Sequence, residues 1–555
     1  MTLPPDSPAR YVSEAACEGV GNSTALKTRY QQAIPETLGS PVKVKPVLFL
    51  LLFSVGVSTA QAADPQPSDP KPAPLYLETQ PVDTTQLVAW LTGGVSTSRL
   101  ARLVTERGLA TLPTRTELGQ VESAGADGNL MRALSAGNAQ SAKIGAPIPL
   151  GLLNASADAR RQHYHEAEMQ LRQVLNSTGI NSDEGSSTGA ALRGHNSALH
   201  FALGQMLRHQ EQWDDAFDEL TEATRLMPAL PENHCALAYL FFRLDDGPNA
   251  IAEARTALSI DPNNSEAYQY LGLGLYANGQ YPAAVRSFNE SLARDHHNPD
   301  TYYNMGIALH ADGDLPGAIA AYRQAIRLKP DFWEAHSNLG LILHEQGNLD
   351  EAVFEYREAK RLAPGEASIR NNLGNTYCDE GNFDAAIGEL SELYRQHPEW
   401  QQGHTCLANA YMSKRNYDAA VDQLRLAVQQ NPTASAEHRV LGQVLLLDNQ
   451  PEEAVRELRI AVSLNPDSES AHHVLGMALF QQNQLHAAEK EFREALRLNG
   501  SAENHFVLAA CLTSLDRYEE ALAELDAAAR LDPDRTLYRA RREELLKLMK
   551  ETNQR

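Results

Sequence analysis

The chain has 555 residues, and its 71 acidic and 48 basic side chains give a formal net charge of −23. Nearly all of this charge falls on residues 195–555, which hold 54 acidic and 32 basic side chains and carry −22. A negative field repels phosphate, so we exclude nucleic acid as a partner. Two interpretations of the charge are open: repulsion that keeps a soluble surface monomeric, or a groove that favours basic or neutral extended partners.

The N-terminal segment predicts export. Residues 47–58 form an apolar run that follows Lys43 and Lys45 and precedes Ala60-Gln61-Ala62. A positive flank, a short apolar core and a small-residue cleavage motif are typical of a secretory signal peptide, here about residues 43–62 with cleavage after Ala62. The run is shorter than the roughly 20 residues of a membrane-spanning helix. We therefore expect a periplasmic or cell-envelope protein that contacts a membrane only through an uncleaved signal segment; a short membrane anchor is the alternative.

The position of this signal within residues 1–62 is unusual, because about 40 residues precede it. We interpret residues 1–41 as the product of a misassigned start. The start codon would then encode Val42 or Val44.

Three further segments precede the main part of the chain. Residues 63–83 are rich in proline and predict an extended linker. Residues 84–136 predict a small helical module, with Ser96, Thr114 and Asp127 placed as N-caps. The module is similar to small helical modules ahead of repeats or enzymatic domains in some secreted bacterial proteins, and we infer no activity from it. Residues 137–196 predict a connector with one helix at about 158–176.

A repeat of 34 residues occupies the rest of the chain. Prolines recur at Pro228, Pro262, Pro330, Pro364, Pro398, Pro432 and Pro466, and Pro533 follows after a shift of one residue. Counting from them gives ten units between residues 197 and 535, nine of 34 residues and one of 33. Positions 7 and 8 of a unit usually read Leu-Gly, as in Leu339-Gly340, and position 20 is usually alanine. Such a period is the signature of a stacked repeat protein.

Each unit predicts two short antiparallel helices. Apolar residues return at helical spacing, as in Leu339 and Leu343 on the first helix and Ala352 and Tyr356 on the second. Glycine at position 8 and alanine at position 20 allow close approach of the two backbones. Helices of this length are marginal alone, so each unit depends on its neighbours to cover its apolar face.

This pattern resembles the tetratricopeptide repeat, which has Leu-Gly, Ala, an aromatic residue, Ala and Pro at these offsets. The resemblance implies an all-α fold, a right-handed α-solenoid of about ten helix-turn-helix repeats at 197–535, with a capping helix and tail at 536–555. His296 and Gly500 depart from the pattern because they stand where proline is expected. We expect the solenoid to bend or fray first at these two junctions.

In the tetratricopeptide family the first helices of the units line a concave face. Asparagine recurs at position 6 in Asn304, Asn338 and Asn372, and at position 9 in Asn375 and Asn409. Neighbouring first helices lie about 10 Å apart, and an amide side chain can bond both the N–H and the C=O groups of an extended peptide. The array is similar to the asparagine ladder that holds substrate peptides in O-linked N-acetylglucosamine transferase. The alternative is that asparagine is merely tolerated near solvent.

Histidine and cysteine carry weaker signals. His310 and His344, at position 12, are further candidates for the concave face. Histidine also recurs at position 4, where we expect the ring to fill space that usually holds an aromatic residue, with a response to pH as a second interpretation. Four cysteines lie at different phases of different units, which predicts small core residues and neither a disulfide framework nor a zinc site. These are Cys235, Cys378, Cys406 and Cys511.

The sequence contains no catalytic, metal-binding or cofactor motif. HExxH, G-x-S-x-G and a phosphate-binding Gly-rich loop are all absent from it. We therefore predict a non-catalytic scaffold, without cofactor, that binds a protein or an extended peptide in its groove. One alternative is an accessory or targeting subunit for a separately encoded cell-envelope enzyme. Another is an activity of residues 84–136.

Overall fold

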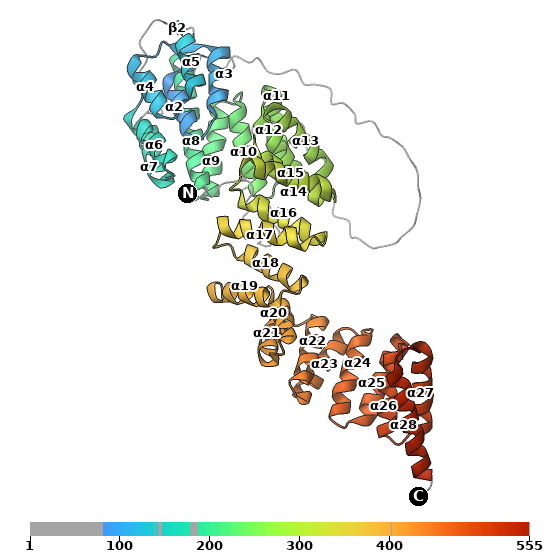
Figure 1. Ribbon diagram of the computed structural model, residues 1–555. Helices are drawn as coiled ribbons and strands as arrows, with labels where there is room; N and C mark the ends of the chain where they lie inside the picture. Colours follow the sequence, from blue (N-terminus) through green and yellow to red (C-terminus); the bar gives the residue numbers. More distant parts are fainter. Residues whose placement is uncertain (1–80, 138, 142–146, 178–186, 401, 554–555) are drawn as a thin grey trace, which may run out of the picture. The chain divides into compact units, whose positions relative to one another are not determined.

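The computed structural model describes residues 81–137, 139–141, 147–177, 187–400 and 402–553 (Figure 1). It divides into a first body that ends at Pro330 and a second body that spans Asp331–Arg555. The predicted signal peptide at 43–62, the extension before it and residues 63–80 of the predicted linker lie outside the described residues.

The first body begins with the predicted helical module and continues into repeats. Its helices are α2 Thr84–Thr92, α3 Thr97–Arg107, α4 Arg115–Ser123, α5 Gly128–Ala136, α6 Leu150–Arg160, α7 Tyr164–Ser177, α8 Ser187–His209, α9 Trp213–Leu226, α10 Pro231–Arg243, α11 Gly247–Ile260, α12 Ser265–Ala277, α13 Tyr281–Arg294, α14 Pro299–Ala311 and α15 Leu315–Leu328. Two short strands, β1 Leu109–Thr111 and β2 Ala139–Ser141, pair in parallel.

The three predicted N-caps of the module are confirmed. The side chains of Ser96, Thr114 and Asp127 each accept a hydrogen bond from a backbone N–H in the first turn of α3, α4 and α5. Such bonds satisfy donors that have no partner inside the helix.

The prediction of a connector with one helix at 137–196 is wrong in its helix content. Helix α6 spans Leu150–Arg160, of which we expected residues 150–157 to be a loop, and α8 begins at Ser187 inside the same segment. The glycine, serine and alanine content suggested a flexible linker. Leu152 and Ala155 of α6 are nevertheless buried in the core that the module shares with the first repeats. Tertiary burial therefore overrides the weak local helix propensity.

The module is attached to the repeats of the first body. Helix α2 contacts α8. The guanidinium of Arg99 in α3 pairs with the carboxylates of Glu232, at 2.5 Å, and Asp261, at 3.0 Å. Residues 84–136 therefore cover the end of the helical stack instead of forming a separate domain.

The second body contains only helices, turns and loops within its described residues. Its helices are α16 Trp333–Glu345, α17 Leu349–Leu362, α18 Ala367–Asp379, α19 Phe383–Gln396, α20 His404–Ser413, α21 Tyr417–Gln430, α22 Ser435–Leu447, α23 Pro451–Leu464, α24 Glu469–Gln481, α25 Leu485–Leu498, α26 Ala502–Ser514, α27 Tyr518–Leu531 and α28 Thr536–Asn553. In both bodies each predicted unit holds two helices. The all-α solenoid is thus confirmed, and its right-handed sense stays a prediction.

The helices of a unit end where local backbone chemistry requires it. The residue at position 15, between the two helices, has a positive φ in every unit, which ends the first helix. It is Gly279, Gly313, Gly347 or Gly381 in four units and Glu211, Asp245, Arg415, Asn449, Asn483 or Asp516 in the others. The second helix ends two residues before the proline position, and it does so also where His296 and Gly500 replace proline.

The predicted close approach at position 8 is confirmed. A Cβ atom on Gly306 of α14 would lie 2.6 Å from Cε1 of Tyr322 in α15. That ring is fully buried, as is Ala318 one turn before it. The ring of Tyr322 therefore occupies the space that a side chain at Gly306 would need, and the two helices pack closely.

Helix α28 covers the end of the second body, as predicted for a capping helix. Tyr538 is buried, and its ring packs on Phe506 of α26 with 5.2 Å between centroids. Leu545 is buried in the same core. None of the described helices combines the length and apolarity needed to cross a membrane.

Candidate binding face of the first helices

The first helices of the second body present an array of amides that we name the amide strip: Asn338 in α16, Asn372 and Asn375 in α18, and Asn409 in α20. On α18 the residues between the two asparagines, Leu373 and Gly374, are buried in the core. The asparagines on either side are partly exposed. Helical spacing thus turns one face of α18 to the core and leaves its amides at the surface.

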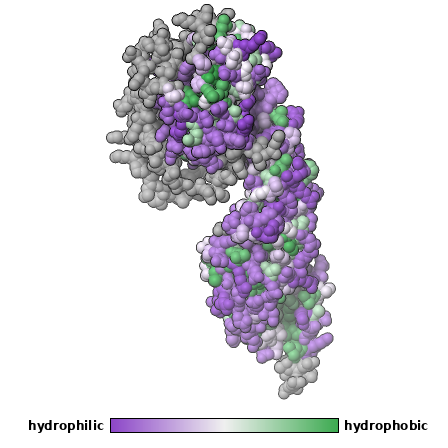
Figure 2. All heavy atoms as spheres, turned by 90° about the vertical axis from the view of Figure 1, so that its left-hand side faces the viewer, coloured by the Kyte–Doolittle hydropathy of each residue, from purple (hydrophilic) through white to green (hydrophobic). Residues whose placement is uncertain are grey.

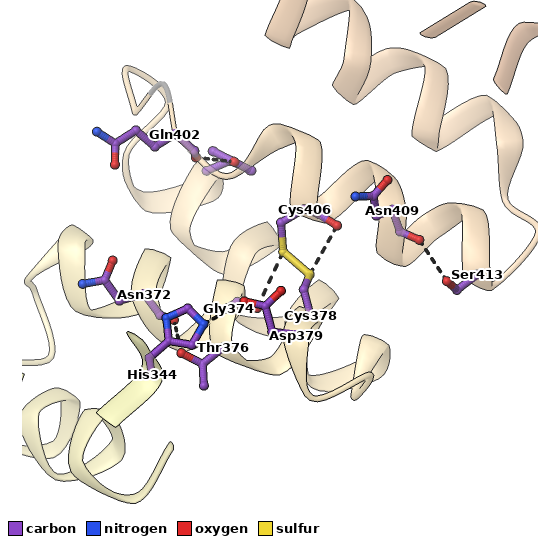
Figure 3. The surroundings of a disulfide bond; sticks show 11 residues. His344, Asn372, Gly374, Thr376, Cys378, Asp379, Gln402, Cys406, Asn409 and Ser413 are labelled. Atoms are coloured by element: carbon purple, nitrogen blue, oxygen red, sulfur yellow. Dashed lines mark hydrogen bonds and ion pairs between the residues drawn. A yellow bond between two sulfur atoms is a disulfide. The ribbon is translucent and has the colours of Figure 1, made fainter. Parts of the chain in front are cut away.

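Neighbouring first helices lie side by side, because α16 contacts α18 and α18 contacts α20. Figure 3 shows Asn372 and Asn409 on either side of the junction between α18 and α20. The side-chain amides of Asn375 and Asn409 form no hydrogen bond within the described part of the chain. An amide that has no partner of its own keeps both its donor and its acceptor available.

Two predicted site residues, Asn304 and His310, belong to α14 of the first body. Asn304 is only 2% exposed, and neither its amide oxygen nor its amide nitrogen has a hydrogen-bond partner among the described residues. His310 is partly exposed in the last turn of the same helix. Four of the five predicted asparagines therefore belong to the second body, and Asn304 belongs to the first.

His344 joins two neighbouring repeats. Its Nε2 lies 2.7 Å from a carboxylate oxygen of Asp379, from the last turn of α16 to the last turn of α18 (Figure 3). The pair lies next to the amide strip, and its carboxylate is largely exposed. His344 is thus tied to its neighbour while Asp379 adds negative charge at the edge of the strip.

The prediction that no cysteine forms a disulfide is wrong for two of the four repeat cysteines. Cys378 of α18 and Cys406 of α20 form a disulfide with 6.2 Å between their Cα atoms (Figure 3). Cys378 is at position 12 of its unit and Cys406 is at position 6 of the next unit. In identical stacked units these two positions would lie far apart along neighbouring helices, which is why no disulfide was expected. Helix α20, however, begins only at His404, after Gly403 with a φ of 91°, and its first turn lies beside the last turn of α18.

The other two cysteines match the prediction of small core residues. Cys235 and Cys511 are free and buried. Burial raises the pKa of the Cys235 thiol well above its usual value and that of Cys511 to about 11. Neither thiol is therefore activated as a nucleophile.

The histidines at position 4 do more than fill space. Their Nδ1 atoms lie 2.5 to 2.9 Å from position 23 of the second helix in the same unit. The pairs are His200–Glu219, His234–Glu253, His336–Glu355, His404–Gln423, His438–Glu457, His472–Glu491 and His505–Glu524. Position 4 and position 23 are separated by 19 residues in every one of these units, so the recurrence of the pair is present in the sequence.

Among the described residues, no group of three or more His, Cys, Asp or Glu side chains converges as metal ligands would. Each histidine at position 4 instead forms a hydrogen bond with position 23 on the second helix of its own unit.

Three family models match the chain. One described as "TPR repeat" matches residues 272–313, 308–347 and 340–381. One described as "Tetratricopeptide repeat" matches residues 371–435 and 406–469. One described as "Anaphase-promoting complex, cyclosome, subunit 3" matches residues 458–528. All these ranges lie within the predicted repeat region.

Several solved structures are similar to this chain at low sequence identity. The APC/C hetero-tetramer Cut9–Hcn1 is 15% identical, with 71% of this chain and 89% of that chain covered and a TM-score of 0.38. YrrB, described as a TPR protein with an unusual peptide-binding site, is 23% identical, with 35% and 97% covered and a TM-score of 0.29. Yeast Tom70 is 14% identical, with 72% and 94% covered and a TM-score of 0.29.

No curated protein matches the sequence. The ranges that the tetratricopeptide models match are built from helix pairs in the structure. The chain therefore contains tetratricopeptide repeats over residues 272–469, and the units before and after them have the same helix-pair construction.

Proposed function

We propose that this protein is a non-catalytic scaffold that binds an extended segment of a partner protein along the first helices of the second body. The single observation that carries the proposal is the amide strip, which places four asparagine side chains at the surface of three neighbouring helices. An extended chain presents N–H and C=O groups at each residue, and an asparagine amide bonds both kinds. Such a surface recognises main chain and tolerates varied side chains.

Electrostatics supports a partner that is basic or neutral. Residues 331–434 hold 16 acidic and 8 basic side chains, a net charge of −8. Asp379 lies at the strip itself. An acidic partner would be repelled from this face, whereas lysine and arginine side chains would be attracted to it.

Export to the periplasm or cell envelope belongs to the same proposal. Its sequence support is the signal peptide predicted at 43–62. The disulfide between Cys378 and Cys406 is independent support, because disulfides persist in oxidising compartments and are rare in reducing ones. N-terminal sequencing of the protein from a periplasmic fraction should give Ala63 as the first residue, and a mature protein that starts at Thr2 would contradict export by this signal.

The binding proposal is tested by substituting Asn338, Asn372 and Asn409 together by alanine. Partners captured by the full chain from a cell-envelope extract are identified, and the most abundant is titrated against both proteins. We expect the triple variant to bind at least tenfold more weakly, since each amide contributes bonds of about 1 kcal/mol. Its unfolding temperature should stay within about 2 °C, because substitutions at surface positions have small effects on stability.

Gln429→Ala is the matched control, because Gln429 is an exposed amide on α21, the second helix of its unit. It should bind as the unchanged protein does. Equal binding by the triple variant would contradict the amide strip as the site. A single partner in a fixed ratio would favour the accessory role for an envelope enzyme, and a population of unrelated partners would favour a general scaffold.

A further inference from the structure

The first body contains a polar cavity between the N-terminal module and the repeats, which we name the junction cavity. Its volume is about 580 Å³. Residues from 94 to 102, around the start of α3, form one wall, and the residues that lead into α12 and α14 form the others. A cavity of this size accommodates a small organic molecule. Because the module supplies one wall, the repeats do not form the cavity by themselves.

The junction cavity differs from the apolar surface of the second body. On the face that Figure 2 shows, the hydrophobic patches of that body are small and are separated by hydrophilic surface. Scattered apolar side chains are normal on a protein surface. In the junction cavity, by contrast, charged side chains converge from three helices, with Arg99 on α3, Glu232 on α10 and Glu266 on α12. Convergent polar groups in one hollow indicate a polar ligand.

The arginines of the cavity already have carboxylate partners, with 2.5 to 3.0 Å between nitrogen and oxygen. The pairs are Arg99–Glu232, Arg99–Asp261, Arg102–Asp261 and Arg294–Glu290. The guanidinium of Arg294 also lies over the ring of Tyr268, 4.1 Å from its centroid. An anionic ligand would have to displace a carboxylate from one of these arginines, so the cavity disfavours anions.

Three carboxylates of the cavity keep oxygen atoms that no cation of the described residues neutralises. Glu232 is only 4% exposed; its Oε1 accepts the hydrogen bond from Arg99, whereas its buried Oε2 has no hydrogen-bond partner there. Glu266 accepts one hydrogen bond, from the hydroxyl of Tyr270 at 2.9 Å. Asp295, directly after α13, accepts one from a backbone N–H. A buried oxygen without a partner costs free energy, which a ligand that donates to it recovers.

The surroundings of Glu266 show the same lack of positive charge. Its side chain is accessible to water, but protein surrounds it, and the loss of bulk solvent raises the pKa of the carboxyl group. The hydroxyl of Tyr270 and the guanidinium groups of Arg208 and Arg99 lower this pKa, but Glu232 adds to the rise and the net shift is upward. A raised pKa means that the negative charge is not fully compensated. A cation bound beside Glu266 would compensate it.

The arrangement of these carboxylates favours ammonium groups over a metal ion. A calcium or magnesium ion needs several oxygen ligands around one point, and the acidic side chains of the described residues are not grouped in that way. An ammonium group donates three hydrogen bonds and accepts none, so a single carboxylate can bind it. The unpaired carboxylates belong to α10, to α12 and to the turn after α13. A ligand with several ammonium groups along one chain can neutralise each of them.

We propose that the junction cavity binds a linear polyamine, whose ammonium groups lie against Glu232, Glu266 and Asp295. The proposal goes beyond the proposed function, because the cavity belongs to the first body and the amide strip to the second. The bound polyamine contacts the module and the repeats together. It therefore stabilises the attachment of α3 to the helices that follow, since a ligand favours the state that binds it.

The test titrates spermidine into the full chain by isothermal titration calorimetry. A salt concentration of about 150 mM screens general attraction between a cation and an acidic surface. We expect one saturable site per chain, weaker binding of putrescine, and at least tenfold weaker binding of n-butylamine, which has a single ammonium group. Spermidine should also slow amide hydrogen exchange in residues 94–102 and 263–269 and leave α22 to α27 unchanged.

The decisive variant combines Glu266→Gln with Asp295→Asn, which removes two charges and keeps the size of both side chains. It should bind spermidine at least tenfold more weakly. Its unfolding temperature should not fall, because neither carboxylate forms an ion pair in the part of the chain that the structure describes. The matched control combines Glu122→Gln with Glu166→Gln, which removes two exposed carboxylates elsewhere in the first body, and it should bind normally. If the double variant is less stable, Glu266→Gln alone should still weaken binding at least threefold.

Equal binding of spermidine by the double variant and by the unchanged protein would overturn the proposal, as would absence of binding. Equal weakening in the control variant would also overturn it, because the attraction would then be general. If Nα-acetyl-lysine methylamide binds as tightly as spermidine, the occupant is a lysine of a protein and the proposal fails. If Mg²⁺ displaces spermidine and is itself lost in the double variant, the cavity is a metal site and the proposal fails.

The alanine variant of Asn338, Asn372 and Asn409 distinguishes this proposal from the proposed function. It should bind spermidine as the unchanged protein does, whatever its effect on the capture of envelope partners. Weaker binding of spermidine by that variant would overturn the assignment of the polyamine to the first body.

Discussion

The disulfide between Cys378 and Cys406 gives the sharpest stability prediction. It closes a loop with a sequence separation of 28 residues. In the chain-entropy model such a loop lowers the entropy of the unfolded chain by about 12 cal/mol/K, which corresponds to about 3.6 kcal/mol at 25 °C. We expect Cys378→Ser with Cys406→Ser to lose up to this free energy, because the unfolded chain regains the freedom that the bond removes.

The loss should be local. In a repeat array each unit contacts only its neighbours, so a weakened junction opens without unfolding the rest. Amide hydrogen exchange followed by mass spectrometry should therefore show faster exchange in α18, α19 and α20. A loss of 3.6 kcal/mol corresponds to about a 400-fold change in an opening equilibrium. Exchange in α24 to α27 should change little.

A reducing agent should reproduce this pattern in the unchanged protein and have no effect on the double variant. Peptide mapping without reductant should recover one peptide that links Cys378 to Cys406. The reasoning is refuted if the linked peptide is absent from protein purified under oxidising conditions. It is also refuted if exchange in α18 to α20 differs less than twofold between the two proteins.

Two further predictions concern packing and pH. Gly374→Ala should destabilise the second body by about 1–3 kcal/mol in urea unfolding, because the new Cβ would lie 2.6 Å from Cγ of buried Leu390. The control is Gly388→Ala in the adjoining α19, where a Cβ meets nothing within 4 Å, and it should stabilise the second body by up to about 1 kcal/mol. Equal effects of the two substitutions would contradict the close approach at Gly374. Burial lowers the pKa of His234, but the hydrogen bond and charge of Glu253 together raise it above 6.5, so the pair stabilises fully below about pH 6.5 and less as the pH rises through the folded-state pKa. Thermal unfolding from pH 6 to pH 8.5 should show a smaller stability loss for His234→Gln than for the unchanged protein, and parallel curves would show that the pair does not titrate in this range.

Several features of the candidate site could be predicted from the sequence, because they depend on one unit at a time. The period placed Asn372 and Asn375 on the same helix and predicted their exposure beside buried Leu373. The histidines at position 4 were predicted to fill space, and their partners at position 23, which are six glutamates and Gln423, were not predicted. Each partner lies on the second helix of the same unit, 19 residues away, so the recurrence was available to sequence reasoning.

Other features depend on how neighbouring units meet. The change from asparagine to valine at position 6 is visible in the sequence, yet only the contacts among α22, α24 and α26 show that these helices are neighbours. The helix α6 was missed because its own composition resembles a linker, and burial of Leu152 against the module stabilises it.

The sequence by itself determined the helix pairs, their ends and the packing of glycine against aromatic rings, because each depends on chemistry that recurs within a unit of about 34 residues. Only the tertiary structure decided which cysteines pair. Helix α20 begins three residues late, at His404, and Cys406 in its first turn lies 6.2 Å, between Cα atoms, from Cys378 in the last turn of α18. Such a departure is a property of two packed neighbours. A repeat pattern describes the average unit, whereas a covalent bond between units depends on their actual positions.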